Sequence, residues 1–92
     1  MTVVARRRRQ KDVLLSELPD GTGVVVHLDK RSYYPLSSTG VLLWHLYDSG
    51  PLEDAALVAC LLQRCGIDEG RAHNDVAAFV RALVAEGMLV DC

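Results

Sequence analysis

The chain has 92 residues, of which 50% are hydrophobic and 24% are charged, and its formal net charge is −2. This length suffices for one domain and is too short for two domains with separate cores. No uninterrupted apolar stretch is long enough to span a membrane, and the basic N-terminus lacks the apolar run of a secretory signal. We therefore expect one small cytoplasmic domain.

The charge is distributed unevenly along the chain. Basic residues cluster in Arg6–Arg9 and Lys11, whereas from Asp12 onward five basic residues stand against twelve acidic ones. The sequence predicts a basic N-terminal segment over residues 1–12, either partly flexible or part of a first strand, ahead of a single domain over residues 13–92. Contact of the arginines with a peptide, a partner enzyme or nucleic acid is the alternative.

Residues 1–36 have the pattern of β structure. The short apolar patches Val3–Val4 and Val13–Leu15 could both belong to a first strand, or only one of them could. The sequence LPDGTG then favours a turn, because proline presets φ and glycine permits positive φ. The β-branched run Gly23–Leu28 predicts the next strand.

Residues 29–32 have the length and polarity of a hairpin connection, and Tyr33–Leu36 follows as a third strand. Pro35 lacks a backbone N–H, so this strand is expected at an edge of the sheet.

From Ser37 the apolar period changes from two to 3.6 residues, which predicts three helices. Ser37 or Ser38 would cap the first, and Asp68 would cap the third. Each helix is expected to bury one apolar face: Gly40, Leu43, Trp44 and Tyr47 on the first; Leu52, Ala55, Ala59 and Leu62 on the second; Ala72, Val76, Phe79, Val80 and Leu83 on the third. Gly87 would end the third helix, with Met88 and Leu89 folding back onto the core.

The predicted fold class is therefore α+β, with a three-stranded antiparallel sheet followed by three helices, and it is similar to a winged helix-turn-helix. A DNA-binding regulator is thus one hypothesis. However, the basic side chains of the third helix are only Arg71, His73 and Arg81, against the acidic Asp68, Glu69, Asp75 and Glu86. The acidic body also opposes binding to phosphates. Nucleic acid is disfavoured as a partner.

Nothing in the sequence indicates catalysis or metal binding. There is no nucleophile elbow, no Walker or dinucleotide glycine pattern and no HExxH motif. The odd set Cys60, Cys65 and Cys92 fits reduced structural thiols, and a catalytic pair of Cys60 with His45 is disfavoured. We expect no enzyme activity, no metal and no cofactor.

Binding at the predicted sheet edge is the more economical hypothesis. An open edge beside an amphipathic helix can accept an incoming strand through main-chain hydrogen bonds. Alternatively, Tyr33 and Tyr34 simply cover the core, and Pro35 guards the edge. Composition alone leaves both interpretations open.

The pattern over residues 23–29 and 32–40, GVVVHLD and SYYPLSSTG, resembles the PqqD-like family, the stand-alone RiPP recognition elements of ribosomal peptide biosynthesis. Residues 71–80 and 86–89 are similar to the family's closing helix. The Leu-Asp before the turn and the tyrosine after it look more like the lasso-peptide branch. Ser32 and Ser37 depart from the glycine and asparagine usual there, and Pro35 departs within the recipient strand.

The resemblance implies that the third strand pairs antiparallel with the leader of a precursor peptide, which also packs on the third helix. Leader-binding residues would then be Tyr33, Tyr34, Pro35, Leu36, Asp75, Phe79, Ala82 and Glu86. The opposite helix flank, His73, Ala77 and Val84, is the alternative. Catalysis would belong to partners, a cysteine protease that removes the leader and an ATP-dependent cyclase.

Overall fold

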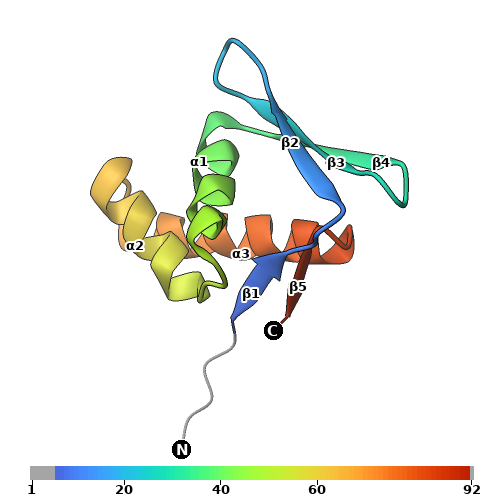
Figure 1. Cartoon of the computed structure of the whole chain (residues 1–92). Coiled ribbons are helices and arrows are strands. Elements are labelled where there is room, and N and C mark those ends of the chain that lie inside the picture. The colour runs from blue at the N-terminus through green and yellow to red at the C-terminus, as the bar shows by residue number, and fades with distance from the viewer. Residues whose placement is uncertain (1–5, 92) are drawn as a thin grey trace, which may run out of the picture.

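A computed structural model describes residues 6–91, so the predictions for Val3–Val4 and Cys92 lie outside the described residues. The elements, in chain order, are β1 (Arg7–Arg9), β2 (Val13–Glu17), β3 (Gly23–His27), β4 (Ser32–Leu36), α1 (Ser38–Leu46), the short 3₁₀ helix η1 (Tyr47–Ser49), α2 (Asp54–Arg64), α3 (Glu69–Ala85) and β5 (Leu89–Asp91). Figure 1 shows a three-stranded sheet with the helices on one side of it. The α+β prediction is confirmed.

The main sheet has the order β2-β3-β4, and both strand pairs are antiparallel. The central residue Val25 lies opposite Leu15 on β2 and Tyr34 on β4 and is fully buried. Because β3 is flanked on both sides, β2 and β4 each leave one edge of the sheet free within residues 6–91.

The helix termini follow from local side-chain chemistry. The Ser37 hydroxyl accepts a hydrogen bond from the N–H of Gly40 at 3.2 Å, and an Asp68 carboxylate oxygen accepts one from Arg71 at 2.8 Å, so both predicted N-caps are confirmed. Gly87 has a φ of 72°, which favours glycine directly after α3. The chain then turns back, and Met88 and Leu89 are buried in the core.

The prediction for the apolar face of the second helix is wrong except for Leu52, which precedes α2 and packs against the core. The residues of α2 that are buried are Leu57, Val58 and Leu61. Ala55, Ala59 and Leu62 face solvent instead. The helix is apolar on several faces, and burying leucine and valine removes more apolar surface from water than burying alanine, so the larger side chains decide its orientation.

A second, smaller sheet pairs β1 with β5 in antiparallel fashion. Figure 1 shows these two short strands side by side, close to the C-terminus. Arg7 also exchanges backbone hydrogen bonds with Leu52, both at 2.9 Å. Strand β5 was not expected from the sequence, because its three residues are too few for a pattern that predicts a strand.

The arginine run is largely engaged by carboxylates of α2, η1 and β5. Arg7 contacts Asp54 at 2.7 Å and Asp91 at 3.0 Å, and Arg9 contacts Asp48 at 2.5 Å. The guanidinium of Arg9 also lies 5.6 Å from the centre of the Trp44 ring. These contacts leave less positive charge available for an external polyanion. Among residues 6–91, no helix has the length and apolar character needed to cross a membrane.

Candidate functional site

A groove of about 480 Å³ runs between the free edge of β4 and helix α3. Consecutive β4 residues line it, although their side chains alternate between the two faces of the sheet. Residues that point to opposite faces of the sheet can line the same groove only if the groove runs along the edge of the strand. Its lining comprises Tyr34, Pro35, Leu36, Ser37, Thr39, Gly40, Leu43, Arg71, Asp75, Ala78 and Phe79.

The backbone groups that β4 turns toward the groove follow from the sheet register. The N–H of Leu28 donates to Asp12 at 2.8 Å and that of Leu18 to Thr22 at 2.8 Å, so the even-numbered residues of β2 and β3 form the hydrogen-bonded pairs. Because such pairs alternate along an antiparallel ladder, the odd-numbered residues of β3 bond to β4. Tyr34 therefore bonds to Val25.

The same alternation turns the main-chain groups of Tyr33 and Pro35 outward, away from β3. Tyr33 offers both an N–H and a C=O at the free edge, whereas Pro35 offers only its C=O. Proline is tolerated at this position because its missing donor faces away from the sheet. An added strand would thus find an incomplete hydrogen-bonding edge.

Helix α3 forms the opposite wall of the groove. Asp75 and Phe79 line it, and both are half-buried. Ala82 and Glu86 lie further along the same half-buried flank but outside the groove. The alternative flank of His73, Ala77 and Val84 is exposed and does not border the groove.

The structure thus brings Tyr34, Pro35, Leu36, Asp75 and Phe79 together around one hollow. Tyr33 is separated from them, because its side chain points to the outer face of the sheet and is 72% exposed. The hollow has an apolar floor and a polar rim, where Arg71 and Asp75 lie 3.7 Å apart. This combination suits an extended chain with alternating side chains better than a small polar molecule.

Sequence reasoning missed several groove residues, above all those from α1 and Ala78. Gly40 is the informative one, because a Cβ there would lie 3.2 Å from Leu36. A glycine on the same predicted face as Leu43 was a signal of close helix–strand packing. Ala78 carried no signal, because small residues are common on exposed helix faces.

Residues 6–91 contain no group of three or more histidine, cysteine or acidic residues able to hold a metal ion. Cys60 and Cys65 are both free thiols on or next to α2, away from the groove.

Comparison with known proteins gives one family and two solved structures. The family model described as coenzyme PQQ synthesis protein D (PqqD) matches residues 22–89. The structure "TbiB1 in Complex with the TbiA(beta) Leader Peptide" is similar with a TM-score of 0.77 at 23% identity, covering 89% of this chain and 93% of that one. "Lasso peptide synthetase B1 complexed with the leader peptide" has a TM-score of 0.75 at 21% identity, covering 91% and 96%. A search of curated proteins gives no match.

Proposed function

Because the chain belongs to the PqqD family, and because an open strand edge borders its main groove, we propose that it binds the leader segment of a ribosomally made precursor peptide. The observation that carries this proposal is the free edge of β4 beside α3. Both solved relatives are described as complexes with a leader peptide, which supports the same ligand class here. The description of the second as a lasso peptide synthetase B1 also favours lasso-peptide biosynthesis.

In this proposal the leader adds to the sheet as a fourth strand, antiparallel to β4. Main-chain groups of Tyr33 and Pro35 supply hydrogen bonds that do not depend on the leader sequence. Alternate leader side chains then point into the groove, where Leu43 and Phe79 offer apolar contacts. Sequence preference would come from these side-chain contacts.

Charge on the α3 flank contributes a second element of recognition. Asp75 lies on the groove wall, and Glu86 lies further along the same flank. The ion pair between Arg71 and Asp75 is long, at 3.7 Å, so a basic leader side chain could compete with Arg71 for this carboxylate. We expect a basic residue of the leader to face Asp75, and Tyr33 to contact the leader from the outer face.

The protein itself is non-catalytic in this proposal. It would present the leader to a cysteine protease that removes it and to an ATP-dependent cyclase. Such a role needs only binding, which fits a domain without a catalytic constellation among its described residues. The cytoplasm, where the thiols of Cys60 and Cys65 stay reduced, is the expected compartment.

The test is a pair of neighbouring substitutions on α3. Ala78 lines the groove and Ala77 does not, although both are exposed. Ala78→Arg should fill the groove and weaken binding of a fluorescent leader, taken from the precursor encoded beside this chain, by at least about tenfold, or about 1.4 kcal/mol. Ala77→Arg adds the same charge one residue away and should leave binding unchanged.

A scrambled leader and a fluorescent DNA duplex complete the experiment. The proposal fails if the leader binds no more tightly than the scrambled peptide. Duplex binding that weakens steeply with salt would instead favour a DNA-binding regulator. Equal losses of leader affinity in Ala78→Arg and Ala77→Arg would indicate that the leader binds the exposed flank of α3.

A further inference from the structure

The sheet has a second free edge, along β2, and a second groove follows it. This groove of about 440 Å³ lies between β2 and α1. Val13, Leu14 and Leu15 line it consecutively, so it follows the strand edge just as the first groove follows β4. Trp44, His45 and Asp48 line the opposite wall.

The edge of β2 carries a complete set of hydrogen-bonding groups. The register that pairs the even-numbered residues of β2 with β3 turns the main chain of Val13, Leu15 and Glu17 outward. Each offers both an N–H and a C=O, and residues 6–91 provide no backbone partner for them outside the sheet. Unlike β4, this edge contains no proline.

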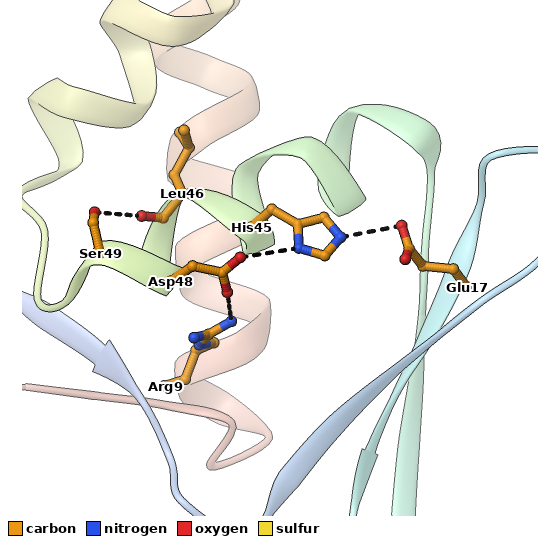
Figure 2. Close-up of polar contacts among 6 residues, drawn as sticks. All are labelled: Arg9, Glu17, His45, Leu46, Asp48 and Ser49. Atoms are coloured by element: carbon orange, nitrogen blue, oxygen red, sulfur yellow. Dashed lines mark hydrogen bonds and ion pairs between the residues drawn. The ribbon is translucent and has the colours of Figure 1, made fainter.

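Figure 2 shows polar contacts that link side chains of α1 and η1 to β1 and β2 beside this groove. His45 reaches from α1 to Glu17 on β2, with Nε2 and Oε1 3.1 Å apart. Its Nδ1 lies 3.4 Å from a carboxylate oxygen of Asp48, and Arg9 on β1 holds the other oxygen at 2.5 Å. We call the contact of His45 with Glu17 and Asp48 the clasp.

The clasp is chemically suited to a protonated histidine. A neutral imidazole has one N–H, whereas the imidazolium can donate to both carboxylates. The hydrogen bond with Glu17 is the largest influence on the pKa of His45 and raises it above 6.5. Burial lowers this pKa by less, and Asp48 raises it further. Lys11 is the other cation lining the groove, besides Arg9.

The edge is complementary to itself. A two-fold axis at Leu15 would pair Leu15 with its copy and Val13 with Glu17 of the second chain, so that every outward N–H meets a C=O. Lys11 of the other chain, in the turn two residues before Val13, would then lie close enough to Glu17 for a favourable charge pair. The dimer would contain two symmetric Glu17–Lys11 pairs, and to form them Glu17 would have to break its contact with His45.

We propose that the free edge of β2 is a latent self-pairing site for a second copy of this chain, and that the clasp keeps it closed. Protonation of His45 strengthens the clasp, because the imidazolium has a second N–H to donate. Loss of the proton as the pH rises weakens the hold on Glu17 and favours pairing. The protein should therefore be monomeric at pH 5.5 and associate more readily at pH 8.5.

Sedimentation velocity of the full chain over a range of concentrations tests this without any leader peptide. His45→Ala should associate at least tenfold more tightly than the wild type at pH 5.5 and should lose the dependence on pH. His73→Ala is the matched control, because His73 also contacts an acidic residue, Glu69 at 3.7 Å, but lies on α3 away from β2. His73→Ala should behave like the wild type.

Two further variants separate edge pairing from other kinds of association. His45→Ala with Glu17→Ala keeps the outward N–H of residue 17 and should associate, although less tightly for want of the Lys11 contact. His45→Ala with Glu17→Pro removes that N–H and should be monomeric. The proposal is overturned if His45→Ala stays monomeric, if the proline variant associates equally, or if His45→Ala binds two leader peptides per chain without dimerising.

Discussion

The two edges of the sheet differ in a way that their hydrogen-bonding groups alone do not explain. The β4 edge lacks a donor at Pro35, yet it opens onto a groove whose wall is the half-buried flank of α3. The β2 edge keeps every donor and acceptor, yet His45 reaches across from α1 to Glu17. Which edge can receive a guest chain thus depends on the side chains facing it as much as on the main chain.

The largest expected effect comes from placing one charge on each edge in turn. Tyr34→Asp puts a carboxylate into the β4 groove beside Asp75, so leader affinity should fall by at least about tenfold, or about 1.4 kcal/mol. Leu14→Asp makes the matching change on β2, where the leucine is 58% exposed, and should leave leader affinity unchanged. Fluorescence anisotropy measures both affinities, and circular dichroism verifies folding.

A reversed result, with Leu14→Asp impairing binding and Tyr34→Asp tolerated, would assign the leader to β2. Equal losses would mean that neither edge is specific and that the charge acts through the fold as a whole.

Restoring the missing donor on β4 should have a smaller effect, in the opposite direction. Pro35→Ala returns an outward N–H at a position whose side chain is exposed. One additional hydrogen bond to the leader should raise its affinity about threefold, in line with a net contribution of about 0.5–1.5 kcal/mol. Isothermal titration calorimetry resolves a change of this size. Unchanged affinity would argue that the leader does not pair at residue 35.

The smallest expected effect concerns the clasp on β2. The pKa of His45 is raised in the folded state, chiefly by Glu17, so its stabilising contribution is present below pH 6.5 and is lost as the pH rises through the higher folded value. Because the group is exposed, we expect its removal in His45→Gln to lower the thermal midpoint at pH 5.5 by only about 1–2 °C. At pH 8.5 the two midpoints should coincide, as measured by calorimetry at low protein concentration. If the thermal midpoints of the wild type and His45→Gln differed more at pH 8.5 than at pH 5.5, the protonation of His45 in the clasp would be contradicted.

Much of the fold could be predicted because strong local signals agree with the tertiary structure. The β-branched run of β3, the caps Ser37 and Asp68, and Gly87 all act within a few residues of their own position. The orientation of α2 could not be predicted, since leucines, valines and alanines occur around most of its circumference. Only packing against α3 selects the face with Leu57 and Leu61.

In the candidate site, too, features set by local sequence could be predicted and features set by packing could not. Pro35 correctly placed its strand at a sheet edge, because a missing N–H excludes a central position. The groove itself could not be predicted from local pattern, as it forms where β4, α1 and α3 meet. The role of the arginine run could not be predicted either, because its contacts with Asp48 and Asp54 join segments far apart in the chain.

The hairpin joining β3 to β4 has a consequence for the rigidity of the groove. Lys30 at its tip lies over Gly87, where an added Cβ would come within 2.6 Å of its Nζ, and the other end of β4 runs directly into the cap of α1. The end of β4 that runs into α1 is therefore held by the helix cap before any guest arrives. A chain joining it would find a wall already in place, so most of the loss of conformational freedom on association would fall on the guest rather than on the host.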